Sequence, residues 1–265
     1  SILSKNSRLP LTRVRKEVML SRDGIDYRIK RLVDKNVILK FSPLINYRSL
    51  GYYDFHVFFV IDEKNKSRKN EFIKFLKKHT YVRKLIEYSD RFDFEIVLFC
   101  RGLEEFDIKI TEIISRFPDL IIEKVNMEVI KGYLSTQVPK IFSKDTGINI
   151  GKRFFKPKEI EVDEIDVKIL QFLSKDARIP YYNIAQKLDV TGGTVKYRIN
   201  NMIENNLIRC FSIILNLTAL GFHWYTFLMR TKKFDKSYDK KLYAFADQNP
   251  YILKCVKTLG TWDFV

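Results

Sequence analysis

The stretch Val190–Asn205, which reads VTGGTVKYRINNMIEN, predicts the tight turn and the third helix of a helix-turn-helix. Thr191 is a natural N-cap residue, so we expect the helix to begin at Gly192 and to continue to Asn205. Apolar side chains recur along it at helical spacing, which predicts one buried face. That buried face consists of Val195, Ile199, Met202 and Ile203.

Two shorter helices are expected before this turn, and a β-prone segment follows it. Residues Val162–Leu173 have the apolar spacing of an amphipathic helix. The chain breaks at Arg178–Pro180, and a second helix is expected at Tyr181–Asp189, with the proline at its start, where its fixed φ is tolerated. The segment Leu207–Ile214 then predicts a wing or a linking strand.

The chain repeats itself without a gap when 170 is added to a residue number. Ser4–Pro10 (SKNSRLP) returns as Ser174–Pro180 (SKDARIP), and Leu50-Gly51 returns as Leu220-Gly221. This period is far above the roughly 20–50 residues of solenoids and propellers. The sequence therefore predicts a duplicated two-part unit.

The first copy predicts the same helices as the second. We expect helices at Pro10–Met19 and Gly24–Lys35, with Ser21 as the N-cap of the latter, and a β-prone segment at Val37–Phe41. The expected buried face of its third helix consists of Ile25, Ile29, Leu32 and Val33.

A second kind of domain follows the helices in each copy. In the first copy, the expected strands and helices have the order βαββαβ. They are Tyr53–Ile61, Arg68–His79, Val82–Tyr88, Phe94–Cys100, Leu103–Arg116 and Leu120–Ile130. This order predicts a ferredoxin-like sandwich, an antiparallel sheet with helices on one face. The fold class is therefore α+β, with two tandem units, each a winged helix-turn-helix followed by a ferredoxin-like domain.

The expected domain boundaries follow the repeat. They are 1–45 and 161–215 for the helix-turn-helix domains, 46–134 and 216–265 for the ferredoxin-like domains, and 135–160 for a basic linker. The first copy begins inside its first helix, and the second stops at Val265, the counterpart of Glu95. We expect both ends to be incomplete.

The composition favours a polyanionic partner. The chain has 48 basic and 32 acidic residues, a formal charge of +16, which suits a nucleic acid or an anionic membrane surface, unless it reflects a basic proteome. The three cysteines have no CxxC spacing, and His56, His79 and His223 are isolated, so no metal site, cofactor or catalytic residue is expected. No signal peptide or membrane span is recognised, which favours a soluble, cytoplasmic protein.

Several short motifs, taken in order, resemble one family. They are Asp163-x-x-Asp166, Asp176-x-Arg178, Ile184-Ala185, Val190-Thr191-x-x-Thr194-Val195-x-x-Arg198-Ile199 and Gly260-Thr261-Trp262-Asp263-Phe264. Together they resemble the Lrp/AsnC (feast/famine) transcriptional regulators. The resemblance implies a cytoplasmic DNA-binding factor, usually prokaryotic and often archaeal. It also implies oligomerisation through the sandwich domains and, in some members, a response to an amino acid or another small-molecule effector.

The first copy departs from this pattern. Arg15 stands at the counterpart of Ala185, where a small residue lets the second and third helices cross. Gly24 replaces Thr194, and Asp90 replaces Gly260. We expect the fold to survive these changes, whereas an effector pocket in the first copy is in doubt.

The candidate DNA-contacting residues lie on or next to the two recognition helices, because such helices read base edges and hold phosphates with flanking cations. In the first copy they are Arg22, Tyr27, Arg28, Lys30 and Arg31. In the second copy they are Thr191, Thr194, Lys196, Tyr197, Arg198, Asn200 and Asn201. Arg22 could pair with guanine, and Asn200 or Asn201 with adenine.

Two alternatives to DNA contact stay open. The exposed side chains could simply form solvated helix faces. Arg28 and Arg198 lie beside the buried stripe and could bind a carboxylate of the preceding helix instead of a phosphate.

The two DNA-binding regions differ in charge. Residues 1–40 carry eleven basic and four acidic residues, a net charge of +7. Residues 174–210 carry six and three, a net charge of +3. We therefore expect the first copy to contribute more to salt-dependent affinity.

The resemblance implies that an effector would bind at Gly260, Thr261 and Asp263. In the alternative interpretation, the glycine serves a β-turn and the aspartate caps it. The leading functional hypothesis is a non-enzymatic regulator with two unequal DNA-binding units and partners that include double-stranded DNA. The alternatives are an enzyme similar to sirohaem decarboxylases, which look like this family, and a factor that acts by contacting the transcription machinery.

Overall fold

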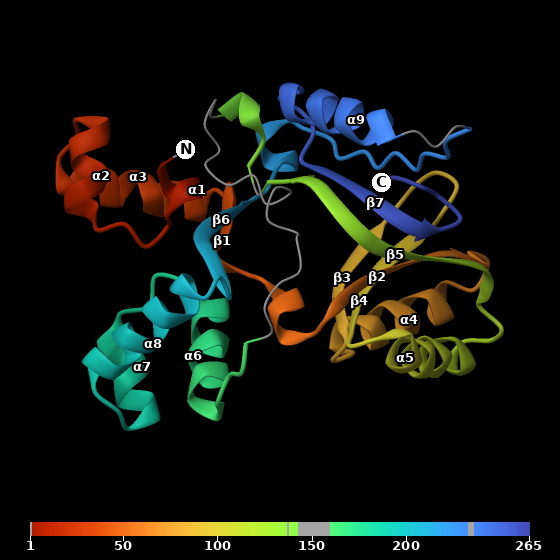
Figure 1. Ribbon diagram of the computed structural model, residues 1–265, viewed down its shortest axis with the longest axis horizontal. Helices are drawn as coiled ribbons and strands as arrows, with labels where there is room; N and C mark the ends of the chain where they lie inside the picture. Colours follow the sequence, from red (N-terminus) through yellow and green to blue (C-terminus); the bar gives the residue numbers. More distant parts are fainter. Residues whose placement is uncertain (1, 137, 143–159, 233–235) are drawn as a thin grey trace. The chain divides into compact units, whose positions relative to one another are not determined.

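The computed structural model describes residues 2–136, 138–142, 160–232 and 236–265 (Figure 1). Contacts divide the chain into two compact units. The helix-turn-helix unit comprises Ser1–Leu50, Leu134–Thr226 and Asp239–Lys254, and the sandwich unit comprises Gly51–Tyr133, Phe227–Tyr238 and Cys255–Val265. The domain boundaries expected from the sequence stay a prediction.

The first helix-turn-helix consists of α1 (Ile2–Lys5), α2 (Leu11–Val18) and α3 (Arg22–Asp34). The Ser21 side chain accepts a hydrogen bond from the Gly24 N–H at 3.0 Å, so Ser21 is the N-cap. The helix therefore begins at Arg22 and not at Gly24 as expected, because a capping side chain reaches the N–H three residues further on.

The second helix-turn-helix consists of α6 (Glu164–Lys175), α7 (Tyr181–Leu188) and α8 (Gly192–Glu204). Thr191 is the N-cap of α8, since its side chain accepts from the Thr194 N–H at 3.1 Å. Asp163 caps α6 in the same way, through the Asp166 N–H at 2.8 Å. The helices enclose a core whose most buried side chains include Ile169, Leu173, Ile184, Val195 and Ile199.

Three residues expected inside the two recognition helices are substantially exposed. Ile203 is 40% exposed because it lies about 80° around the helix from Val195, at the margin of the buried face. In the first copy, Ile25 is buried, but Leu32 and Val33 are each 39% exposed. In the second copy, α6 packs along α8, and Met202, the counterpart of Leu32, is buried.

The strands that follow the two recognition helices pair with each other. Strands β1 (Ile38–Ile45) and β6 (Ile208–Leu215) form an antiparallel ladder, as Figure 1 shows. Ser42 lies opposite Ser212, and these two residues are counterparts in the repeat. The ladder is therefore centred on a local pseudo-twofold axis, and each β-prone segment is a linking strand.

Backbone hydrogen bonds around the ladder obey the same symmetry. The Ser7 N–H donates to the Phe211 carbonyl at 2.8 Å, and the Ala177 N–H donates to the Phe41 carbonyl at 3.0 Å. Adding 170 to Ser7 gives Ala177, and adding 170 to Phe41 gives Phe211. One copy therefore pairs with the other much as two subunits of a symmetric dimer would.

Two equivalent arginines, Arg8 and Arg178, complete this junction, and we call them the arginine clasp. Nη1 of Arg8 donates to the carbonyl oxygens of Ala177 and Ile179, the latter at 3.0 Å. Nη1 of Arg178 donates to the Ser7 carbonyl at 2.8 Å. Each guanidinium group also lies over the phenylalanine ring of the opposite strand, at 5.4 and 5.3 Å from its centroid. Burial lowers the pKa of Arg178 from its ordinary value.

The sandwich confirms the ferredoxin-like order βαββαβ. Its elements are β2 (Tyr53–Ile61), α4 (Lys66–Lys78), β3 (Val82–Glu87), β4 (Phe94–Cys100), α5 (Leu103–Arg116) and β5 (Ile121–Ser135). The strand order is β3-β4-β2-β5-β7, and α4 and α5 cover one face (Figure 1). Between these helices and the sheet lies an apolar core that includes Phe55, Phe59, Phe72, Phe94 and Ile110.

The second copy contributes an edge strand and a covering layer to this sheet. Strand β7 (Lys254–Gly260) is hydrogen-bonded to β5. Leu228, Trp262 and Val265 pack against Phe58 and its neighbours, on the face opposite α4 and α5. Part of the second copy therefore covers the face of the sheet that the two helices leave free.

The remaining described elements are α9 (Lys236–Gln248) and three short 3-10 helices, η1 (Tyr47–Leu50), η2 (Lys140–Phe142) and η4 (Thr218–Leu220). Within the expected basic linker, Lys140 bonds to the Asp247 carboxylate at 2.7 Å, and residues 143–159 lie outside the described part. Among the described helices, none has the length and apolar character needed to cross a membrane.

Candidate nucleic-acid interface

The first recognition helix, α3, exposes most of its candidate residues to solvent. Arg22, Arg28 and Arg31 are exposed, and Tyr27 is 64% exposed. Lys30 forms an ion pair with Asp26 at 2.8 Å, and the hydrogen bond to this carboxylate raises the lysine pKa. Three arginines and one tyrosine are therefore available on this helix for a partner.

Helix α2 extends the positive surface of the first copy. Its exposed cations are Arg13, Arg15 and Lys16. In the described part of the chain, no carboxylate lies within 4.0 Å of these three side chains or of the three exposed arginines of α3. Such a concentration of uncompensated positive charge suits a phosphate backbone.

The second recognition helix, α8, presents a more neutral polar face. Lys196 and Asn200 are exposed, and Tyr197 is 71% exposed. Asn201 is also exposed, but its side-chain oxygen accepts a hydrogen bond from Asn205 at 2.8 Å. This face has fewer cations and more groups suited to base edges.

Thr191 and Thr194 are engaged in the cap of α8. Besides the bond from the Thr194 N–H, their two hydroxyl oxygens lie 2.9 Å apart. These contacts fix the start of the recognition helix. The two threonines therefore have a structural role that does not depend on contact with DNA.

Arg198 binds two carboxylates. Its Nη1 donates to Asp163 at 2.6 Å and to Asp166 at 3.1 Å. These bonds raise the pKa of Arg198. The pKa of Asp163 is lowered, mainly by the hydrogen bond from the Asp166 N–H and next by the hydrogen bond from Arg198. Arg198 therefore binds carboxylates, as one of the two interpretations had it, but they belong to the start of α6 and not to the preceding helix α7. A phosphate contact by Arg198 stays a prediction.

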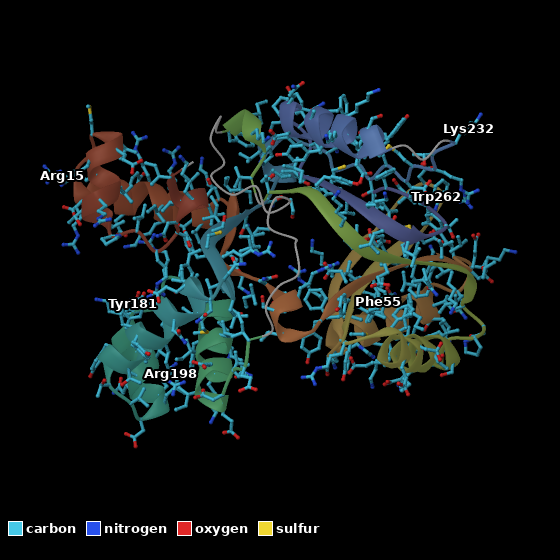
Figure 2. The ribbon with its side chains drawn as sticks, viewed as in Figure 1. Arg15, Phe55, Tyr181, Arg198, Lys232 and Trp262 are labelled. Carbon is cyan, nitrogen blue, oxygen red and sulfur yellow. The ribbon has the colours of Figure 1, made fainter. Side chains whose placement is uncertain are left out.

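The two copies differ most at the crossing of their second and third helices. Ala185 is buried on α7, whereas its counterpart Arg15 is exposed on α2 (Figure 2). An arginine is accommodated in the first copy because its side chain leaves the helix pair and enters solvent. The fold therefore survives this departure, as the sequence predicted.

The candidate effector residues lie in the turn after β7. Gly260 has φ of +140°, and a Cβ atom there would lie 2.5 Å from the Asn126 carbonyl oxygen of β5. A glycine is required at this position because of the positive φ and because the backbone lies so close to the neighbouring strand. Thr261 is exposed, and its carbonyl accepts two hydrogen bonds from Arg230.

Asp263 has a structural role that is repeated in the first copy. Its carboxylate accepts from the Thr231 N–H at 2.7 Å and from the Thr231 hydroxyl at 3.2 Å. The counterpart carboxylate, Asp93, accepts from the Ile61 N–H at 2.8 Å. These bonds join Asp263 to a residue 32 positions away, so capping of the Gly260 turn and an effector contact by Asp263 both stay predictions.

The structure contains a buried polar cluster that was not predicted from the sequence. His56 was interpreted as isolated, but its Nδ1 contacts the Glu95 carboxylate, whose other oxygen accepts from the Tyr88 hydroxyl at 2.5 Å. The residues are 39 and 7 positions apart and meet only because their strands pair. In the described part of the chain, no group of three or more histidine, cysteine or carboxylate side chains could hold a metal ion.

Comparison with known proteins places the second helix-turn-helix in a defined class. Residues 162–209 match the family described as winged helix-turn-helix DNA-binding. The chain is 38% identical over 69 residues to the HTH-type transcriptional regulator LrpB of Bacillus subtilis, covering 26% of this chain and 46% of that protein. It is 34% identical over 79 residues to the regulatory protein AsnC of Haemophilus influenzae, covering 30% and 53%.

These relatives confirm the resemblance to the Lrp/AsnC regulators. The match spans about half the length of the curated relatives. Among solved structures, the siroheme decarboxylase NirDL has a similar fold over 99% of this chain and 77% of its own, with a TM-score of 0.66 and 13% sequence identity. That likeness concerns the fold alone, and it supports the tandem α+β architecture.

Proposed function

We propose that this chain is a sequence-specific DNA-binding regulator of the Lrp/AsnC type that uses two unequal DNA-binding units. The observation that carries the proposal is the pairing of two capped recognition helices through one β-ladder within one chain. A symmetric homodimer would place two identical helices on DNA, whereas this chain supplies two different ones.

The first unit contributes mainly electrostatic affinity. Arg22, Arg28 and Arg31 on α3 approach the phosphates, assisted by the cations of α2. Arg22, in the first turn of the helix, also reaches a guanine. Because no carboxylate in the described part of the chain neutralises these cations, they bind phosphates by releasing counterions, and their contribution falls as salt is added.

The second unit contributes relatively more base recognition. Lys196 and Tyr197 lie in the second turn of α8, and Asn200 presents an amide that can pair with adenine. Thr191 and Thr194 hold the helix start in place, and Arg198 links α8 to α6 through its carboxylates. The unit therefore offers a rigid helix with a neutral, hydrogen-bonding surface.

Selection of bound duplexes from a random pool tests this proposal. We expect enrichment of two unlike half-sites separated by about one helical turn or a multiple of it. Asn200→Ala should relax one half-site, and Arg22→Gln should relax the other. A palindromic consensus would contradict the division between the units, and no enrichment would contradict sequence-specific binding.

Further partners follow from the same proposal. An amino acid or another small effector would bind at the turn of Gly260, Thr261 and Asp263, with the exposed Thr261 as the accessible contact. Oligomerisation through the sandwich, contact with the transcription machinery and a cytoplasmic location are also part of it. Protection of the turn from hydrogen exchange by one of the twenty amino acids, lost in Thr261→Arg, would support the effector site.

The second candidate function is a sirohaem-decarboxylase-like enzyme. The observation that favours it is the likeness of the whole chain to the fold of NirDL. The visible absorption spectrum of the purified protein separates the two hypotheses. A bound tetrapyrrole without measurable affinity for DNA would favour the enzyme, and a colourless protein that selects a DNA site would favour the regulator.

A further inference from the structure

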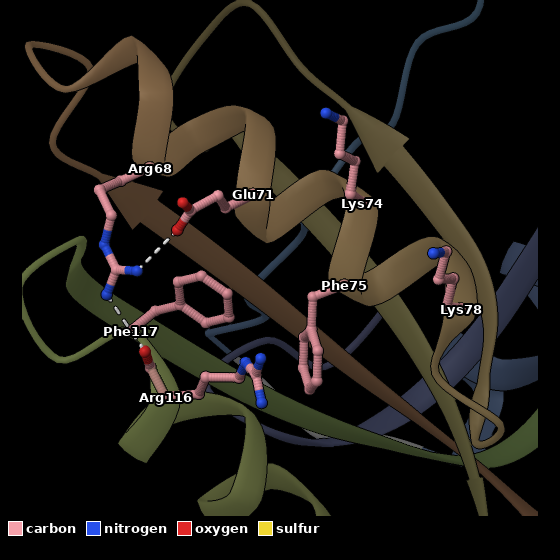
Figure 3. A pocket seen from close by; sticks show the side chains of 7 residues that line it. All are labelled: Arg68, Glu71, Lys74, Phe75, Lys78, Arg116 and Phe117. Carbon is pink, nitrogen blue, oxygen red and sulfur yellow. Dashed lines mark hydrogen bonds and ion pairs between the residues drawn. The ribbon is translucent and has the colours of Figure 1, made fainter.

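A cavity of about 400 Å³ lies on the outer side of the sandwich, between α4 and the end of α5. Figure 3 shows the side chains that line it. Four of them are cations, namely Arg68, Lys74, Lys78 and Arg116, and one is a carboxylate, Glu71. This cavity adjoins the helices, whereas Trp262, next to the candidate effector turn, packs on the opposite face of the sheet.

Two aromatic rings form the floor of the cavity. Phe117 is buried and belongs to the core of the sandwich, and the Phe75 ring lies 5.6 Å from it. The guanidinium group of Arg116 lies 5.0 Å from the centroid of Phe75, and that of Arg68 lies 5.0 Å from the centroid of Phe117. Stacking of this kind orients both guanidinium groups along the floor.

Arg68 lines the cavity, but its guanidinium group is already paired with carboxylates. It donates to both carboxylate oxygens of Asp119, at 2.8 and 3.0 Å, and to Glu71 at 2.8 Å. It also donates to the carbonyl oxygen of Arg116 at 3.2 Å. The bonds to Asp119 and then to Glu71 raise the pKa of Arg68 further above its ordinary range.

The three other cations of the cavity differ from Arg68 in their partners. Within the residues that the structure describes, no carboxylate lies within 4.0 Å of Lys74, Lys78 or Arg116. Lys74 and Lys78 are four residues apart on one helix, a spacing at which like charges repel. Lys78 and Arg116 lie in the last turns of their helices, where a cation is favourable, but Lys74 does not.

We propose that this cavity binds a small organic phosphate of nucleotide size. A phosphate would neutralise Lys74 and Lys78 as point charges and would accept paired hydrogen bonds from Arg116. The cavity is larger than a bare phosphate requires and lies within the usual range of small-molecule sites. Phe75 and the apolar stems of the two lysines supply a surface for the organic part.

Calorimetric titration of the 265-residue chain with ADP at low salt tests the proposal, with inorganic phosphate and a duplex DNA as separate probes. We expect ADP to bind, and Lys74→Gln/Lys78→Gln to weaken it at least tenfold. Lys66→Gln/Lys77→Gln is the matched control, since it removes the same charge from the same helix outside the cavity, and it should weaken ADP by twofold or less. Unchanged thermal midpoints show that both variants fold.

Three outcomes would overturn the proposal. The first is no heat of binding with millimolar ADP. The second is equal weakening in the two variants, which would indicate diffuse attraction. The third is a loss of duplex affinity in the cavity variant that matches its loss of ADP affinity, which would assign the surface to DNA. Because ADP is titrated without DNA, failure here leaves the proposed regulator intact.

Discussion

The two helix-turn-helix regions have the same elements but use their arginines differently. Each region contributes one arginine to the clasp, but in the second region Arg198 also binds two carboxylates, and Arg209 donates to the Asn46 side chain at 2.8 Å. In the first region, Arg22 and Arg28 are exposed without a carboxylate partner in the described part of the chain.

Because of this difference, the two regions differ more in the number of cations available to a partner than in formal net charge. The formal charges of the regions, +7 and +3, count engaged and free cations alike. Because half of the basic residues of the second region are arginines held by protein groups, the contrast in available charge is larger than the contrast in formal charge. Among the described residues, the first region therefore presents more cations without a carboxylate partner than the second.

The largest effect is expected where the copies cross their helices differently. Ala185→Arg should destabilise the chain by roughly 3 kcal/mol or more, because the long charged side chain would have to enter a buried helix crossing. Arg15→Ala, the reverse change in the first copy, should alter stability by less than about 0.5 kcal/mol. Chemical denaturation measures both. Equal effects would show that the two crossings are packed alike.

The arginine clasp should come next. Arg178→Ala should cost about 2 kcal/mol, because a partly buried guanidinium group loses its hydrogen bond to the other copy and its stacking on the Phe41 ring. Arg8→Ala should cost a similar amount, since its contacts are the symmetric counterparts. Arg13→Ala, at an exposed cation of α2, is the control and should cost less than about 0.5 kcal/mol. A clasp variant as stable as the control would contradict a stabilising role of Arg8 and Arg178 at the junction of the two copies.

The helix caps should show a smaller difference. Ser21→Ala and Thr191→Ala should each cost about 1 kcal/mol. Thr191→Ala should cost the larger amount, because the Thr191 hydroxyl also contacts the Thr194 hydroxyl, whereas Ser21 faces Gly24. Denaturant midpoints of the two variants give the comparison, and a larger loss for Ser21→Ala would contradict it.

The smallest effect concerns pH. The Asp166 N–H and Arg198 lower the pKa of Asp163 below its ordinary value of 3.8. A carboxyl group whose pKa is lower in the folded state stabilises the fold above its unfolded pKa, and this stability is lost as the pH falls through the folded pKa. Asp163→Asn keeps a capping side chain but removes the charge, so the acid loss of stability below about pH 4 should become shallower. Asp189→Asn is the control, and equal flattening in both would contradict the assignment.

Local structure could be predicted from the sequence because its causes are local. The N-caps at Ser21 and Thr191 follow from short side chains before helical patterns, and β2, β4 and α5 have the expected bounds. The order βαββαβ follows from the same patterns.

The junction and the site contacts could not be predicted, since they depend on residues far apart in sequence. Nothing local in Ser42 indicates that it faces Ser212. Arg198 had two plausible partners until α6 was placed beside α8. His56 and Glu95 meet only through the register of β2 and β4.

The salt dependence of binding to a selected duplex tests the central claim most directly. Removing one cation that binds a phosphate lowers the slope of log affinity against log salt by about 0.9. We expect Arg22→Gln/Arg28→Gln to lower the slope by about 2, and Lys187→Gln/Lys196→Gln, which removes the same charge from the second region, to lower it by about 1 or less. Equal changes in slope, or a larger change in the second variant, would contradict the account of two unequal DNA-binding units.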